Sequence, residues 1–339
     1  MNIVNNLFEE EFVRKLFQEK LLPHYPDFSV IKKITINPHK QYIWEKTYHV
    51  VLEFRTVLAR ADGSEEELEI FCTAHSSEPR ENAYNALRFL WDSGFGEGDL
   101  TAPHPLFFDQ KLRAFFYRGV SGRSLYYYIK EKRFDEVERL VPLSADWYAK
   151  LHQVPVRGAE NFNPENSRIK TVVPGIDKIL KSIKEDYPEK YDLYKKIFKI
   201  FEKNEADFLE SADRLWLIHG DAHPENIIRM GETKIAGIDF TDVCLSDFAR
   251  DLGSFSQQLE YMAGRKMGDP VFTERMKNLF LESYLKSAKI ELTPDLKKRI
   301  DNYYNWTTIR TATFFLMKHN PWPDRAEPLL NIVRKRLGI

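Results

Sequence analysis

The sequence predicts an α+β protein of two lobes, in which a small antiparallel β-sheet with one inserted helix precedes a larger, mostly helical lobe. Three observations carry this prediction. The first ~120 residues hold several segments rich in β-branched and aromatic residues, which favour strands. After Gly122 the apolar residues recur at helical spacing over long segments. A chain of 339 residues also has room for about two domains.

The first lobe is expected to span residues 1–118 and to begin with a helix. Apolar residues follow a helical pattern between Leu7 and Leu22, which places a leading helix over 6–22. The later elements are strands over 30–36, 49–58 and 68–75, a helix over 79–91 with a proline near its first turn, and a hairpin over 106–117. The Asp62-Gly63-Ser64 sequence predicts a turn between the second and third strands.

The second lobe is expected to span residues 119–339 and to be mostly helical. Its predicted helices cover 124–132, 135–152, 176–209 and the chain from 248 onward, with three short strands at 215–218, 227–230 and 235–239. A hinge is expected near 117–122, and a cleft between two lobes is a natural place for a small-molecule site.

The composition is that of an ordinary soluble globular protein, with 43% hydrophobic and 30% charged residues. The formal net charge of -1 gives no overall field that would favour nucleic acid or a membrane surface, so neither is expected as a partner. Two distant cysteines indicate a reducing compartment, and no apolar run approaches the ~20 residues that span a bilayer. We therefore expect a cytoplasmic location, with the oligomeric state left open.

One segment carries most of the functional information. It reads His219-Gly220-Asp221-Ala222-His223-Pro224-Glu225-Asn226, and Ile238-Asp239-Phe240 follows it. Two apolar runs around a glycine-containing turn separate Asn226 from Asp239 and predict a β-hairpin, which would let both side chains face one metal ion. Phosphoryl transfer from ATP needs such a set: one carboxylate near the attacking hydroxyl, and an amide and a second carboxylate to hold magnesium.

The layout and the motif resemble the aminoglycoside phosphotransferase and choline kinase-like family of small-molecule kinases, which have a bilobal protein-kinase-like fold. The resemblance covers about residues 29–320 and is most specific over 219–253. It implies that Asp221 is the catalytic base and that Asn226 and Asp239 bind Mg²⁺. It also implies supporting roles in the loop for His219, His223 and Asp251, although His223 could equally approach the phosphates.

The same resemblance implies a nucleotide site in the first lobe, formed by the residues Phe116, Tyr117, Gly119, Glu81 and Thr73. The backbone from Phe116 to Gly119 falls at the expected adenine-binding hinge, and Glu81 opens the expected helix. The pattern departs at the third strand, where Thr73 occupies the position of the lysine that normally grips the nucleotide phosphates.

Two neighbouring features bear on this departure from the family pattern. Phe71 shares the strand face of Thr73 and could crowd the adenine space. The cations Lys46, Arg55 and Arg80 are candidates to replace the missing lysine.

The preferred functional hypothesis is an ATP- and Mg²⁺-dependent phosphotransferase that acts on a hydroxyl of an amino sugar, amino alcohol or sugar-like molecule. Acidic residues near the motif favour a cationic acceptor, and the helical segment at 160–212 with the C-terminal helices would form the acceptor pocket. The alternative is a kinase-fold binding or regulatory protein with little turnover, which the missing lysine motivates. A protein kinase is disfavoured because Thr241 follows Asp239-Phe240. The choice between ATP and GTP stays open.

Overall fold

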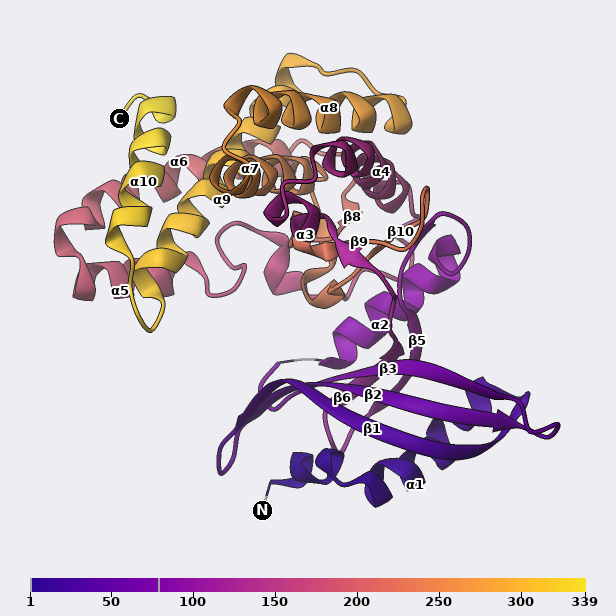
Figure 1. The fold of residues 1–339 in the computed structure, drawn as a ribbon. Coiled ribbons are helices and arrows are strands. Elements are labelled where there is room, and N and C mark those ends of the chain that lie inside the picture. The colour runs from indigo at the N-terminus through magenta and orange to yellow at the C-terminus, as the bar shows by residue number, and fades with distance from the viewer. Residues whose placement is uncertain (1, 79) are drawn as a thin grey trace. The chain divides into compact units, whose positions relative to one another are not determined.

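The computed structural model describes residues 2–78 and 80–339, which form two compact units. The first unit contains Met1–Gly122 and Met230–Thr241, and the second contains Arg123–Arg229 and Asp242–Ile339. Each unit is coloured by position along the chain in Figure 1. Within the described residues, no helix is long and apolar enough to cross a membrane.

The first unit is built on a five-stranded antiparallel sheet in the order β1-β2-β3-β6-β5. Its strands are β1 (Phe28–Ile43), β2 (Tyr48–Arg60), β3 (Glu65–His75), β5 (His104–Asp109) and β6 (Ala114–Arg118). The predicted strands and hairpin are confirmed, but β1 is much longer than the predicted 30–36. Its second half is polar and contains Pro38, which an edge strand tolerates because it pairs on one side only.

The core of the first unit lies on one face of this sheet. Helix α1 (Glu10–Lys20) follows the short 3₁₀ helix Ile3–Phe8, lies along the sheet (Figure 1) and buries Val13 and Phe17 against it. Successive side chains of a strand point to opposite faces. Leu68, Ile70, Cys72 and Ala74 therefore enter the core, whereas Phe71 and Thr73 belong to the other face of β3.

Helix α2 (Arg80–Leu90) continues into a π-helical turn, Trp91–Phe95, and the expected start at Pro79 lies outside the described residues. No sequence pattern indicated β4 (Leu100–Thr101), which pairs in parallel with β10 (Ile235–Gly237). A two-residue strand is too short to show a periodic pattern. This pairing joins the segment Met230–Thr241 to the first unit.

The second unit consists mainly of helices, and α7 packs against α8 and α9 while α4 packs against α8. The helices are α3 (Leu125–Lys130), α4 (Phe134–His152), α5 (Ile176–Asp186), α6 (Tyr191–Leu209), α7 (Ala249–Lys266), α8 (Pro270–Ala288), α9 (Pro294–Met317) and α10 (Pro323–Leu337). Its short strands are β7 (Arg123–Ser124), β8 (Trp216–Ile218), β9 (Ile227–Arg229) and β11 (Cys244–Ser246).

The prediction of one helix over 176–209 is wrong, because the structure has two helices there. Helix α5 ends at Asp186, and Tyr187 leaves the helical conformation with φ -142° and ψ 58°. Proline disfavours the α region for the residue that precedes it, and Pro188 also lacks the N–H that a continuing helix would need. The helical pattern of apolar residues on both sides concealed this break.

A pH-dependent stability is expected from His49, whose ring lies 4.7 Å from that of His75 at the end of the sheet. Burial and the charges of Lys40 and Arg80 lower the pKa of His49 to about 4. Folded His49 therefore binds a proton more weakly than unfolded His49, and acid favours unfolding between the two pKa values.

We expect the free energy of unfolding to fall as the pH drops from about 6.5, the pKa of an unperturbed histidine, to about 4. The decline should be shallower in His49→Gln when urea unfolding is followed across this range. The exposed His319→Gln should behave as the wild type does. Identical declines in His49→Gln and the wild type would contradict the assignment.

Candidate active site

The loop that carries the motif connects β8 to β9 in the second unit. Strand β8 pairs with β11, and the loop ends in a 3₁₀ turn over Pro224–Asn226. Gly220 has φ +81°, and a Cβ atom at this position would overlap the backbone oxygen of Asp242. Only glycine combines this conformation with this close approach, so the glycine of the motif lets the chain turn tightly in front of Asp221.

A buried carboxylate holds the start of this loop from behind. Asp251, in the first turn of α7, accepts hydrogen bonds from the backbone N–H groups of His219 (2.6 Å) and Gly220 (3.0 Å). Its Oδ2 also lies 3.1 Å from Nε2 of His152, whose Nδ1 lies 2.8 Å from the Tyr284 hydroxyl. Burial raises the pKa of Asp251, but these hydrogen bonds and the nearby histidines lower it more. Asp251 is therefore a buried anion that braces the loop.

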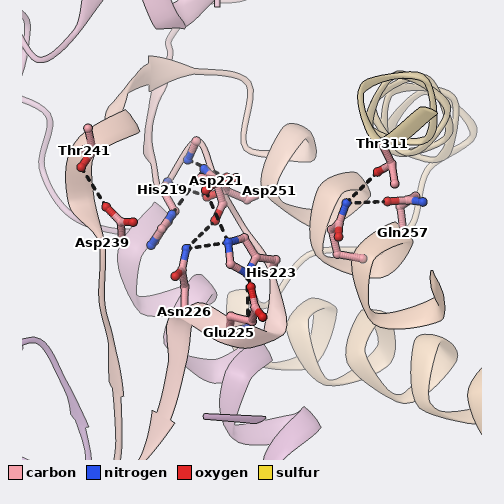
Figure 2. A network of polar contacts seen from close by, with 12 residues as sticks. His219, Asp221, His223, Glu225, Asn226, Asp239, Thr241, Asp251, Gln257 and Thr311 are labelled. Atoms are coloured by element: carbon pink, nitrogen blue, oxygen red, sulfur yellow. Dashed lines mark hydrogen bonds and ion pairs between the residues drawn. The ribbon is translucent and has the colours of Figure 1, made fainter. Parts of the chain in front are cut away.

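Three side chains of the loop meet at its tip, as Figure 2 shows. Nδ1 of His223 accepts from the backbone N–H of Glu225 (3.2 Å), and its Nε2 lies 3.1 Å from Nδ2 of Asn226. This Nε2 lies 3.4 Å from the Asp221 carboxylate. The Asn226 Nδ2 donates to the backbone oxygen of Asp221 at 3.0 Å. The side-chain oxygen of Asn226 is thereby left as the atom that could bind a cation.

The Asp221 carboxylate is ionised at neutral pH. Desolvation raises its pKa, but the hydrogen bond and charge of His223, together with the charges of Arg310 and His219, lower it well below the ordinary carboxyl value. The side chain nevertheless remains 47% exposed. An accessible carboxylate that stays deprotonated can accept a hydrogen bond or a proton from an incoming hydroxyl.

Asp239 lies in the first unit, two residues after the end of β10. Its φ of +63° falls in the left-handed region, which Asp tolerates better than most residues and which often marks functional positions. One carboxylate oxygen accepts from the Thr241 hydroxyl at 2.8 Å, and the residue is exposed. No group of three or more His, Cys, Asp or Glu side chains able to hold a metal occurs among the described residues. A Mg²⁺ ion would therefore need amide, phosphate or water oxygens as well.

The residues expected to bind nucleotide are spread over the first unit. Thr73 is buried on β3, and Glu81 is exposed in the first turn of α2. Phe116 is fully buried in the core, and the β6 backbone at Phe116 and Tyr117 pairs with β3 on one side and β5 on the other. The N–H of Gly119 donates to the backbone oxygen of Glu69 at 2.8 Å. These backbone groups already have partners in the sheet.

Phe71 fills the space on the face of β3 that Thr73 shares. Its ring stacks on Tyr117 at 5.8 Å and on His39 at 5.7 Å between ring centroids. A Cβ atom at Gly119 would overlap the Phe71 ring, so the glycine lets the ring approach the backbone. This face of the sheet is therefore lined by aromatic rings and carries no lysine at Thr73.

Among the three candidate replacement cations, Arg80 is the one connected to Asp239. Its Nη1 donates to the Thr241 hydroxyl at 3.1 Å, and that hydroxyl donates to Asp239. Arg80 is 7% exposed, its Nη2 pairs with Glu78 at 2.7 Å, and its Nε–H has no acceptor among the described residues. Arg55 instead pairs with Glu53 at 2.8 Å, and Lys46 lies in the exposed β1–β2 turn.

A cavity of about 310 Å³ opens beside Asp221 in the second unit. It is lined by Gly220, Asp221, Ala222, Ser254, Gln258, Tyr261, Thr307, Arg310, Thr311, Phe314 and Phe315. Apart from the motif itself, these residues come from α7 and α9. The sequence predicted an acceptor pocket formed by residues 160–212 and the C-terminal helices, but no lining residue of this cavity comes from 160–212. The lining side chains of α7 and α9 were not predicted individually, because no motif or spacing marks them.

Comparison with known proteins identifies a family match and similar folds. A model of the phosphotransferase enzyme family, described by that name, matches residues 48–284. No curated protein sequence matches the chain.

Three solved structures illustrate the likeness of the fold. A Plasmodium vivax ethanolamine kinase is 17% identical with a TM-score of 0.57, and the match covers 88% of this chain and 80% of that one. A choline/ethanolamine kinase family protein from Mesorhizobium loti is 14% identical with a TM-score of 0.58, covering 97% and 95%. An amicoumacin kinase in complex with AMP-PNP, Ca²⁺ and Ami is 15% identical with a TM-score of 0.53, covering 97% and 95%. At these identities the likeness shows the fold alone, and it confirms the predicted fold class.

Proposed function

This chain belongs to the phosphotransferase enzyme family, and on that premise we propose that it transfers the γ-phosphoryl group of ATP, with Mg²⁺, to a hydroxyl of a small molecule. The carrying observation is the braced loop in which an ionised and accessible Asp221 carboxylate lies at the edge of a cavity of about 310 Å³. That volume suits a small acceptor. The family and the kinase neighbours support small-molecule phosphotransfer, and the neighbour solved with AMP-PNP and Ca²⁺ is consistent with a nucleotide donor and a divalent cation.

Each residue of the motif has a distinct part in this proposal. Asp221 orients the acceptor hydroxyl and takes its proton as the oxygen bonds to the γ-phosphorus, while the bond from that phosphorus to the departing ADP breaks. The side-chain oxygen of Asn226 and the exposed carboxylate of Asp239 would hold the cation, since hard divalent cations prefer oxygen ligands. A Mg²⁺ ion held there would neutralise negative charge on the donor phosphates.

A second candidate function is a binding protein of the same fold with little turnover, and one observation favours it. The position of the expected lysine is occupied by Thr73, and Phe71 fills the neighbouring space between Tyr117 and His39. Retention of Asp221, Asn226 and Asp239 favours catalysis, because ligand binding alone needs no base beside a cavity.

Nucleotide binding and turnover, measured with and without Mg²⁺, separate these functions. The kinase proposal expects calorimetric ATP binding that depends on Mg²⁺ and slow ATP hydrolysis that Asp221→Asn abolishes. Binding without turnover, unchanged in Asp221→Asn, would instead identify the binding protein. Failure of ATP and GTP to bind with any divalent cation would rule out the kinase.

We further propose that Arg80 supplies the phosphate-binding cation that Thr73 cannot. Its guanidinium is buried in the first unit, contacts Asp239 through Thr241, and retains a donor without an acceptor among the described residues. Arginine presents donors in a planar fork that matches phosphate oxygens. A bound triphosphate would accept a hydrogen bond from the Nε–H of Arg80, and the positive charge of the guanidinium would attract its negative charge.

Arg80→Gln is expected to weaken ATP binding by about 1.5–3 kcal/mol, the usual contribution of a hydrogen bond to a charged group. AMP, which lacks the β- and γ-phosphates, should bind as it does to the wild type. Isothermal titration calorimetry with both nucleotides measures the difference, and Arg88→Gln on the exposed side of the same helix is the matched control. Equal weakening of ATP and AMP would indicate a structural role only.

A further inference from the structure

The cavity beside Asp221 is lined by few charged side chains. Among the described residues that line it, Asp221 is the single acid and Arg310 the single cation. The other polar lining consists of uncharged hydroxyl and amide side chains from α7 and α9, and Tyr261 of α7 is one of them. A ligand whose hydroxyl meets the base Asp221 would therefore find no further carboxylate in the lining, but it would find a guanidinium.

Hydrogen bonds between the uncharged side chains of α7 and α9 fix their positions in the cavity lining, and Figure 2 shows part of this network. The Gln258 Nε2 donates to Thr311 (3.0 Å) and to Gln257 (2.9 Å), so its side-chain oxygen is left as an acceptor. The Ser254 and Thr307 hydroxyls lie 2.9 Å apart and hydrogen-bond to each other. Fixed hydroxyl and amide groups of this kind suit recognition of several hydroxyls on one ligand.

Arg310 makes no ion pair among the described residues. Its guanidinium stacks over Trp306 at 4.8 Å, and Nη2 donates to the backbone oxygen of Val173 at 3.2 Å. Burial lowers the pKa of Arg310 while the Asp221 charge raises it, and an arginine stays protonated in proteins. The stacking and the one backbone contact orient the guanidinium and leave donors for a further acceptor.

Two acids next to the motif, Glu225 and Asp242, do not line the cavity, although the Asp242 charge acts on Arg310. Glu225 is exposed and does not line the cavity, and the Asp242 carboxylate accepts from Asn166 at 2.7 Å. An ammonium group beside Arg310 would meet a like charge, and like charges in a partly desolvated site repel each other.

We propose that the acceptor is a polyhydroxylated small molecule bearing an anionic oxyacid group, carboxylate or phosphate, and that Arg310 binds this group while Asp221 meets the reacting hydroxyl. This inference rests on the proposed function and names the substrate class of the same site. The planar guanidinium pairs with carboxylate or phosphate oxygens through two parallel hydrogen bonds. Arg310 is in this view a specificity-determining residue, and amino sugars and amino alcohols are poor acceptors.

Acceptors with one carbon skeleton and different end groups test the inference. Gluconate, glucitol and 1-amino-1-deoxyglucitol carry a carboxylate, a hydroxymethyl and an ammonium group on the same polyol, and glucitol 6-phosphate carries a phosphate. Binding is measured calorimetrically, both alone and with Mg²⁺ and AMP-PNP, so that the readout does not require turnover. We expect an anionic polyol to bind about 10- to 100-fold more tightly than the neutral one, and the ammonium compound most weakly. The carboxylate and phosphate arms distinguish the two oxyacid classes.

Variants then assign the preference to Arg310. Arg310→Gln should remove the advantage of the anionic polyol over the neutral one, whereas Arg310→Lys should retain part of it. The exposed Arg334→Gln on α10 is the control for a lost positive charge and should keep the wild-type order. Circular dichroism establishes that each variant is folded.

The outcomes separate this inference from the proposed function. Absence of any preference for the anionic polyols in the wild type, whether all bind alike or none binds, overturns the inference even if Mg²⁺-dependent ATP hydrolysis is intact. A lower kcat in Arg310→Gln with the anionic preference unchanged also overturns it, because Arg310 would then act only on Asp221. Loss of ATP binding and hydrolysis alone would instead refute the proposed function.

Discussion

Replacing Asp221 with asparagine is expected to lower kcat for phosphoryl transfer by about 10²–10⁴-fold, the range for removal of a general base. The amide keeps the size of the carboxylate and can still face Nε2 of His223, but it cannot take the hydroxyl proton. Since Asp221 is proposed to touch the acceptor rather than the metal, the KM for ATP should change little. Steady-state kinetics of ATP consumption with Mg²⁺ measures both constants.

The control for this variant is Glu225→Gln in the same loop, whose exposed carboxylate lies 4.0 Å from His223 and outside the cavity. It should retain activity close to that of the wild type. Because the pKa of Asp221 is lowered, the base stays ionised as the pH falls below neutrality, so an acidic loss of kcat near neutral pH should not arise from it. Activity of Asp221→Asn within a few-fold of the wild type would refute its role as the base.

Replacing Asp251 with alanine is expected to destabilise the second unit by about 3–5 kcal/mol, the usual cost of breaking a buried charged network. The carboxylate is fully buried and binds two backbone N–H groups and His152. Without it, the N–H groups of His219 and Gly220 lose their acceptor, and the loop that positions Asp221 is no longer braced. Urea unfolding followed by circular dichroism gives the free energy, and ATP hydrolysis reports on the loop.

Asp251→Asn keeps the volume and one acceptor oxygen, so it should lose less stability than the alanine variant and still lower kcat. Asp301→Ala, on the exposed face of α9, removes a carboxylate whose ion-pair partner among the described residues is Lys297, and it should change the free energy of unfolding by less than about 1 kcal/mol. If Asp251→Ala were as stable as Asp301→Ala, the bracing role would be wrong.

Local patterns in the chain predicted much of the fold. Alternation of apolar residues along β3 placed Phe71 and Thr73 on one face, and the structure keeps Leu68, Ile70 and Cys72 on the other. Local patterns were insufficient where the periodicity was weak or where it continued across a break in a helix. The polar half of β1 and the two-residue β4 carried no periodic signal, and the break at Pro188 was masked by helical spacing on both sides.

The sequence by itself determined the chemistry that the chain can offer, because the Asp221-to-Asn226 spacing lies within one loop and the later Asp239 follows one predicted hairpin. It also determined what is missing, since Thr73 cannot supply a cation. Only the tertiary structure decided which distant groups join these residues. Arg80 reaches Thr241 and Arg310 reaches the Asp221 cavity through the packing of helices and strands far apart in the chain. Such proximity depends on how apolar faces pack against each other, and the spacing of polar residues along the chain does not predict that packing.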